Sequence, residues 1–310
     1  MPRRAATAQS DGPVMVEVLM LGRNGTVRVE VDPSVERATI EVLTDDPSGP
    51  SADAVTEGAV HWEAQGRDPE LVATGKSPTV EHPHPVPGGR LVARIQTPGI
   101  DPREGSRVEV VARVPINSAV DVDADTADVD VLVSGAADRE VGAADVSVAS
   151  RGGEVRVARS ASVFAEGSRH TWVGESGEVA IHGGEGSVEI GRVTQGLTVQ
   201  RETGSVVVGD VAGDHSSVQL GDGDITVNVS GSGEHTFRAR NGLVTGTRTG
   251  DSSVQATDSR GPVQLHDAGA AEGAATGAAA AAPVTPAKAG VASVRHGNSP
   301  EQRLRGTGIG

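Results

Sequence analysis

The residues with the most suggestive chemistry form a short acidic run, Asp121, Asp123, Asp125, Asp128 and Asp130. Alternate positions of a β-strand share one face, so Asp121 and Asp123 would point the same way. If the strand that carries Asp128 and Asp130 is a neighbour, the two pairs converge. Calcium takes several oxygen ligands at once, and carboxylates supply them. The run is therefore a candidate calcium site, and the alternative is a set of solvated residues in turns and on outer strand faces.

Histidine is the other residue type here that could hold a metal. His82 and His84 flank Pro83, but the prolines force an extended loop and the nearby sequence holds no third ligand. Five further histidines are scattered near expected strand ends, namely His170, His182, His215, His235 and His266. We expect no catalytic or metal-binding role for them, and no cofactor other than the candidate calcium.

Carbohydrate-directed enzyme chemistry is a further candidate, because parallel β-helices host enzymes that act on polysaccharides. Such sites need paired carboxylates, one with a raised pKa, and aromatic platforms for sugar rings. Carboxylates are plentiful, but the chain has two Trp, two Phe and no Tyr. We expect Phe164 and Trp172 to pack in the core, with a sugar platform as the alternative. The sequence contains no nucleophile elbow, phosphate-binding loop or dinucleotide fingerprint, so we predict that the protein is not an enzyme.

Composition narrows the partners and the location. The formal net charge of −15 makes nucleic-acid binding improbable, because the body of the protein repels phosphates. The absence of cysteine excludes disulfides and thiolate metal sites. The N-terminus has arginines but no long apolar stretch behind them, so we expect no membrane insertion and a cytoplasmic protein. Export to the cell surface by an unrecognised route is the alternative.

A repeat through the second half of the chain decides the expected architecture. A Gly/Ser-x-Val-x-Val pattern recurs about every nine residues, and each unit alternates apolar with polar residues before a Gly, Asp, Ser or Asn. Short strands of fixed period indicate a stack in which each unit covers its neighbour. We predict an all-β parallel β-solenoid, a β-helix or β-roll with about 18 residues per coil. The predicted inward positions are Val146, Val155, Val179, Val188, Leu197, Val206 and Val263.

Composition shifts divide the chain into four parts. Residues 1–12 are expected to be a disordered lead, and residues 13–115 a strand-rich, irregular N-terminal cap with the first coils. Asn24 and Gly25 separate two alternating segments and predict a type I′ hairpin, while residues 45–54 predict a loop. Residues 116–266 hold the regular repeats. Residues 267–310, rich in Ala, Gly and Pro, are expected to be a disordered tail.

The tail carries a candidate docking peptide. Ser299 and Pro300 open a short segment with the order of a helix N-terminus, followed by Arg303, Leu304 and Arg305. Such a segment is too short to be a stable helix alone, but it could fold in the apolar groove of a partner protein. The alternative is a spacer without a binding role. Self-association through the ends of the stack is a further possibility.

The chain resembles the bacterial putative-adhesin β-strand-repeat family over roughly residues 14–266. The resemblance rests on the segment from Val108 to Pro115, the segment from Asn117 to Val122, and the serial Gly-x-Val-x-Val repeats that follow. It implies a β-helix or roll and supplies no catalytic residues. The family's name implies adhesion, although most of its members have no characterised function.

Three functions remain open from the sequence. The first is a non-enzymatic structural or interaction scaffold built on an acidic solenoid. The second is an adhesin that binds a surface or a carbohydrate. The third is a β-helix enzyme that acts on carbohydrate, which the shortage of aromatic residues disfavours.

Overall fold

A computed structural model describes residues 1–22, 25–64, 88–96, 107–134, 142–249, 252–258 and 264–267. All of them belong to one compact unit, Met1–Glu272, whereas the second unit, Gly273–Gly310, lies outside the described residues. The described residues are mostly β-strand with one helix, so the all-β prediction is confirmed. That helix is too short to cross a membrane, and no other helix occurs in these ranges.

The elements follow one another along the chain with short connections in the second half. In order they are β1 (Arg3–Thr7), β2 (Met15–Leu21), β3 (Gly25–Val31), β4 (Thr39–Thr44), α1 (Pro50–Glu57), β5 (Ala59–Glu63), β6 (Arg90–Gln96), β7 (Val108–Val114), β8 (Ala119–Ala124), β9 (Asp128–Val133), β10 (Ala143–Ser150), β11 (Glu154–Glu166), β12 (His170–His182), β13 (Ser187–Thr203), β14 (Val206–Val211), β15 (His215–Asp222), β16 (Ile225–Val229), β17 (Glu234–Asn241), β18 (Val244–Arg248), β19 (Ser253–Asp258) and β20 (Gln264–Asp267).

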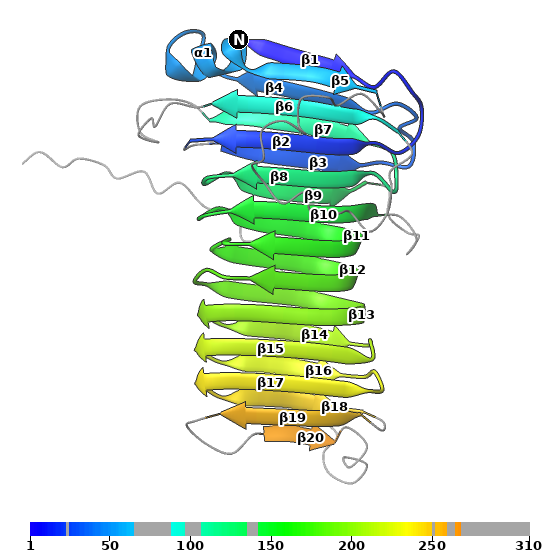
Figure 1. The fold of residues 1–310 in the computed structure, drawn as a ribbon, viewed down its shortest axis with the longest axis vertical. Helices are drawn as coiled ribbons and strands as arrows, with labels where there is room; N and C mark the ends of the chain where they lie inside the picture. Colours follow the sequence, from blue (N-terminus) through cyan, green and yellow to red (C-terminus); the bar gives the residue numbers. More distant parts are fainter. Residues whose placement is uncertain are drawn as a thin grey trace, which may run out of the picture. The chain divides into compact units, whose positions relative to one another are not determined.

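Two rows of parallel strands form the body of the unit (Figure 1). The A row runs through β6, β2, β8, β10, residues 160–166, 178–182 and 196–203, then β15, β17 and β19. The B row runs through β7, β3, β9, residues 154–157, 170–173 and 187–193, then β14, β16, β18 and β20. One strand segment of the A row and the next segment of the B row are called a coil below.

The number of residues per coil is close to the predicted value but varies along the chain. Val163 pairs with Val179, sixteen residues on, whereas Val218 pairs with Phe237, nineteen residues on. Between them, Val188 pairs with Val206 at an interval of eighteen. The number of residues per coil therefore varies, while the pairings remain parallel and keep inward residues beside inward residues.

Alternation along each strand builds a thin core between the rows. A strand turns successive side chains to opposite faces, and here one of the two sets is Val, Ile, Leu or Ala. Six of the seven predicted inward positions are at most 2% exposed, namely Val146, Val155, Val179, Val188, Leu197 and Val206. Val263 lies outside the described residues. Almost no aromatic side chain is needed, because small branched residues fill the narrow space.

The hairpin predicted at Asn24 and Gly25 is wrong. β2 pairs in parallel with β6 and β8 of the A row, and β3 pairs in parallel with β7 and β9 of the B row. The coil made of β2 and β3 is thus inserted between two coils that follow it in the chain (Figure 1). Hydrogen bonds to a coil on each side satisfy both strands, whereas an isolated hairpin would leave one edge of each strand unpaired.

The N-terminal end of the stack is closed by antiparallel strands and the helix. β1 pairs with β4, β4 pairs with β7, and β5 pairs with β6, all antiparallel. The prediction of a disordered lead over residues 1–12 is therefore wrong, because Arg3–Thr7 adds a strand to this end. The prediction of a loop over residues 45–54 is also wrong in part. Pro50 stands in the first turn of α1, a position that suits its fixed φ.

Stacked glycines mark one corner of the coils. Gly204 and Gly223 have φ values of 128° and 130°, a region that other residues rarely adopt. A Cβ at Gly204 would lie 1.9 Å from the carbonyl oxygen of Gly186, in the preceding coil. Glycine is required there both for the turn and for the close approach of neighbouring backbones.

The alternation predicts opposite effects for inward and outward substitutions. Val188→Asp places an unpaired carboxylate in the buried row, so we expect a loss of about 3 kcal/mol or more in unfolding free energy. Gln219→Asp, at an exposed outward position, is expected to change it by at most about 0.5 kcal/mol. Denaturant unfolding followed by circular dichroism measures both, and similar losses would contradict the assigned faces.

Candidate functional site

The four candidate calcium ligands lie in two different rows. Asp121 and Asp123 are on β8 in the A row, and Asp128 and Asp130 are on β9 in the B row. β8 pairs with β2 and β10, whereas β9 pairs with β3 and β11. The strand adjacency on which the calcium prediction depended is thus absent. The described ranges contain no group of three or more His, Asp or Glu residues suited to a metal.

Two of these aspartates have structural partners instead. Asp128 accepts a hydrogen bond from the backbone N–H of Glu154 at 3.1 Å and pairs with Arg107 at 3.1 Å. Burial raises the pKa of the Asp130 carboxyl, and the nearby Arg156 guanidinium partly opposes that effect. Asp128 thus links β9 to β11, the neighbouring strand of the B row.

The remaining predicted residues are placed as follows. His82, His84 and the docking candidates Arg303, Leu304 and Arg305 lie outside the described residues, so their roles stay predictions. Trp172 does not pack in the core: it points outward from the B row and is 37% exposed. The inward residues of its strand are Thr171 and Val173, so alternation leaves the indole outside.

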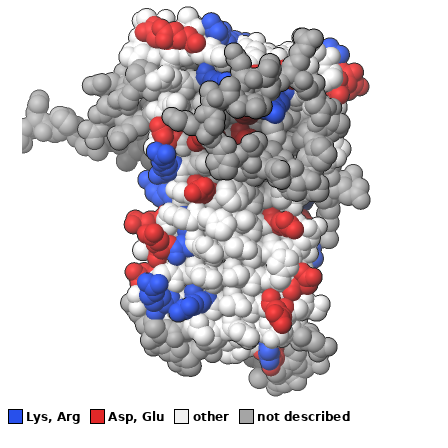
Figure 2. Space-filling view, in the orientation of Figure 1, with Lys and Arg blue, Asp and Glu red and all other residues white. Residues whose placement is uncertain are grey.

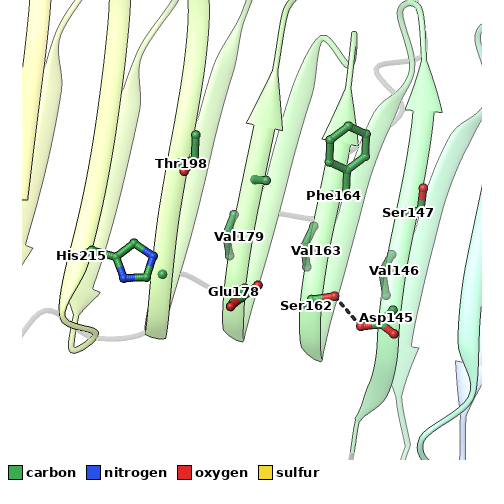
Figure 3. Close-up of a pocket in the computed structure, with 12 residues that line it drawn as sticks. Asp145, Val146, Ser147, Ser162, Val163, Phe164, Glu178, Val179, Thr198 and His215 are labelled. Carbon is green, nitrogen blue, oxygen red and sulfur yellow. Dashed lines mark hydrogen bonds between the residues drawn. The ribbon is translucent and has the colours of Figure 1, made fainter. Parts of the chain in front are cut away.

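A groove of about 270 Å³ crosses the outer face of the A row (Figure 3). Two ladders of outward residues from neighbouring strands form it. One ladder is Asp145, Ser162, Glu178, Gly196 and His215, and the other is Ser147, Phe164, Ala180 and Thr198. The members of each ladder occupy the same register position on β10, β11, β12, β13 and, for His215, β15. We call this hollow the A groove.

Small residues create the hollow, and two rings stand along it. Phe164 and His215 are labelled in Figure 3, and the ladder positions of Ala180 and Gly196 between their strands carry only a methyl group or no side chain. A Cβ at Gly196 would lie 2.5 Å from Nε2 of His215, so the imidazole covers that glycine. Phe164 also contacts His182, with ring centroids 5.7 Å apart. The groove is therefore a shallow trough with a partly exposed aromatic ring.

Asp145 is the chemically unusual residue of the A groove. It is 3% exposed, and its Oδ1 accepts a hydrogen bond of 2.5 Å from Ser162 Oγ. Its Oδ2 is buried and has no hydrogen-bond partner among the described residues. Leaving a buried acceptor unsatisfied costs about 1–3 kcal/mol, more when it is charged. The groove thus has, just below its surface, an acceptor that a ligand N–H or O–H group could satisfy once the side chains over it move aside.

Sequence reasoning missed this ladder because it concentrated on the inward valines. Asp145, Ser162 and Glu178 each precede an inward valine, Val146, Val163 and Val179 respectively. Their shared position, directly before an inward valine, was the signal in the sequence that could have identified them as one ladder. The intervals between the three differ, so only the hydrogen-bond register shows that they are neighbours.

A buried histidine lies on the inner side of the same face. His235 is 1% exposed, its Nδ1 hydrogen-bonds Ser216 Oγ at 2.9 Å, and its Nε2 has no partner among the described residues. Burial lowers the pKa of His235, the charge of His215 lowers it further, and Asp214 opposes both effects. The neutral imidazole is therefore the form that suits the fold.

Known proteins were compared with the whole chain. No family model and no curated protein matches it. Similar solved structures include putative adhesins from Parabacteroides merdae (11% identity, TM-score 0.36, covering 86% of this chain and 95% of that one) and Parabacteroides distasonis (11%, 0.31, 86% and 96%). A putative cell adhesion protein from Clostridium sporogenes is also similar (9%, 0.23, 86% and 99%). The family that the sequence resembles consists of putative adhesins too.

The buried histidine predicts a pH dependence of stability. Its pKa is lowered in the folded protein, so the unfolded chain binds the proton more tightly. Its contribution to stability is then complete above the unfolded pKa of about 6.5 and is lost as pH falls through the folded value. Thermal unfolding at pH 7.5, 6.5 and 5.5 should show a falling midpoint that depends less on pH in His235→Gln. The exposed His266→Gln is the control, and an equal effect of both variants would contradict the assignment.

Proposed function

We propose that the chain is a non-enzymatic, adhesion-type scaffold: a parallel β-solenoid that presents the A groove to a carbohydrate. The parallel pairings at intervals of sixteen to nineteen residues support the solenoid. Rigid strands position every side chain of the groove, which favours a preformed binding surface. The proposal joins the scaffold and adhesin hypotheses, because the scaffold supplies the surface on which binding takes place.

The unsatisfied Oδ2 of Asp145, in a groove that the ring of Phe164 also lines, is the observation that carries the proposal. Sugars offer hydroxyl donors on their edges and apolar C–H faces, and this pair of groups complements both. The hydroxyls of Ser147 and Thr198 add donors and acceptors along the same trough. A carboxylate that accepts from a ligand hydroxyl forms one of the stronger hydrogen bonds.

The shape of the groove fits a short length of chain rather than a small compact ligand. Phe164 and His215 stand three strand spacings apart in the A row, about 14 Å at about 4.8 Å per spacing. A glycan of two or three rings would lie across the strands between them. The floor over Ala180 and Gly196 lets such rings approach the sheet closely.

Binding without catalysis follows from the position of Ser162. A glycosidase places the scissile bond between two carboxyl groups. Here Asp145 and Glu178 occupy ladder positions on either side of Ser162, whose side chain stands between them and hydrogen-bonds Asp145. That position is already filled, so the pair is better suited to holding a sugar than to cleaving it.

Adhesion also requires exposure on the cell surface, and we propose an export route for the chain in place of the cytoplasmic location expected first. Fractionation of the native cell, with and without protease treatment of intact cells, tests this part separately. Protection of the protein from protease in intact cells would contradict surface display and leave the binding proposal to its own test. A protein partner at Arg303, Leu304 and Arg305 stays a proposal beside this one.

A glycan array tests the binding proposal. We expect Asp145→Asn to weaken binding by about 10-fold or more, because it removes a charged acceptor worth about 1.5–3 kcal/mol. Phe164→Ala should weaken it by about 3- to 10-fold through loss of stacking. Trp172→Ala, on the B row, is the matched aromatic control and should bind as the unmodified protein does. Far-ultraviolet circular dichroism establishes that each variant is folded.

Three outcomes would contradict the proposal. One is the absence of any bound glycan. Another is binding that Trp172→Ala abolishes and Phe164→Ala leaves intact, which would place the ligand on the other row. Release of new reducing ends from a bound glycan, lost in Asp145→Asn, would show catalysis and refute the non-enzymatic part.

A further inference from the structure

A second and larger groove lies beside the A groove, toward the C-terminal ends of the A-row strands. Its volume is about 670 Å³, and β13, β15 and β17 contribute most of its lining. We call it the arginine groove, because Arg201, Arg238 and Arg240 line it. Figure 2 shows basic side chains gathered at one lower edge of the visible face, over β17.

Arg238 and Arg240 are outward and unpaired. They alternate with Phe237 and Ala239, which are buried, so both guanidinium groups extend from the same side of β17. Other outward arginines are paired, for example Arg192 with Asp210 at 3.4 Å. Among the residues that the structure describes, neither Arg238 nor Arg240 forms an ion pair or a side-chain hydrogen bond. Two uncompensated cations side by side are unusual in a chain of net charge −15.

The acidic residues of this groove do not neutralise the two arginines. Glu202 and Arg240 occupy ladder positions on either side of Gly221, two strand spacings or about 10 Å apart at their Cα atoms. Gly221, which has no side chain, separates them in the ladder. Asp222 accepts a hydrogen bond from the side-chain amide of Asn241.

A buried third arginine adds positive charge behind the groove. Arg201 is 5% exposed and donates hydrogen bonds to Ser168 Oγ at 3.0 Å and to Thr171 Oγ1 at 3.1 Å. None of these acceptors carries a charge, and its Nε has no partner among the described residues. A buried cation without a carboxylate is costly unless an anion lies close by. Arg201 is in register with the inward residues Leu220 and Ala239, so its guanidinium lies on the other side of the sheet. The two outward guanidinium groups, those of Arg238 and Arg240, are the ones that favour an anion in this groove.

The two grooves share strands and can hold one ligand. Thr198 lines the A groove, and Gln200, the next outward residue of β13, lines the arginine groove. On β15, His215 lines the first groove and Gln219 the second. A glycan chain that leaves the A groove diagonally across these strands reaches Arg238 without crossing the core.

We infer that the arginine groove is an anion subsite, and that the ligand of the proposed binding surface is an acidic glycan bearing a carboxylate or sulfate group. This inference rests on the proposed function. Arginine presents several donors in a planar fork that matches such oxyanions. The surrounding negative charge repels dense polyanions, so the groove selects an isolated acidic group on a largely neutral chain.

Matched pairs of oligosaccharides test the inference. The probes are uronic-acid oligosaccharides and their carboxyl-reduced counterparts, which differ only in the charged group. We expect the double variant Arg238→Gln, Arg240→Gln to lose at least about 10-fold in affinity for the acidic members and to bind the neutral members unchanged. The control double variant is Arg151→Gln, Arg156→Gln, which removes two exposed arginines, 87% and 54% exposed, away from both grooves. It should bind both members as the unmodified protein does.

The outcomes separate this inference from the proposed function. If neutral and acidic members bind equally well and Arg238→Gln, Arg240→Gln changes neither, the carbohydrate surface stands and the anion subsite is refuted. An equal loss in the control double variant would refute it as well, because net charge alone would then explain the effect. If the double variant Arg238→Gln, Arg240→Gln weakens binding of the acidic members alone, the result supports both the anion subsite and the proposed function.

Inorganic sulfate tests the groove even if no glycan binds. At constant ionic strength, a titration followed by backbone amide NMR should shift the signals of Gln219, Arg238 and Arg240 saturably, and Arg238→Gln, Arg240→Gln should remove the effect. Saturable shifts without glycan binding would support the anion site while the proposed function fails. Shifts that are absent, or spread evenly over the protein, would refute the anion site.

Discussion

The parallel hydrogen-bond ladder between successive coils is the constraint on which the rest of this structure depends. Each backbone N–H and C=O group of an inner coil is satisfied by the coils before and after it, so no strand is stable by itself. Because the ladder fixes the register, it also fixes which outward side chains become neighbours. The ladder of Asp145, Ser162 and Glu178 exists only because their backbones are paired in this way.

The same constraint explains the composition. Coils stacked at strand spacing leave a narrow interior, which small branched side chains fill and aromatic rings would mostly overfill. Phe237 fits inside and Trp62 packs against the core at the N-terminal end, whereas Trp172 stays outside and Phe164 lies on the outer face. Corners such as Gly204 bring backbones so close that no side chain is tolerated. Outward positions escape this constraint, and the residues of both grooves named as ligand contacts are found there.

On the A row that freedom produces two adjoining grooves of different character. The A groove combines a ring, hydroxyl groups and a buried carboxylate with an unsatisfied oxygen, while the arginine groove concentrates positive charge in an acidic protein. Neither is deep, because side chains on a flat sheet can enclose little volume. A long ligand that contacts several strands suits such a surface better than a small one, since many modest contacts then add up.

The sequence by itself determined the all-β class, the inward valines and a coil length close to the observed one, because alternation and period are local properties. It could not determine that β2 and β3 enter the stack between two later coils, because nothing local distinguishes that pairing from a hairpin at Gly25. Nor could the sequence show that the acidic pairs of β8 and β9 lie in different rows, because that depends on how the strands pair. The A groove depends on intervals that vary from sixteen to nineteen residues, so the neighbours of Asp145 were decided by tertiary hydrogen bonding alone.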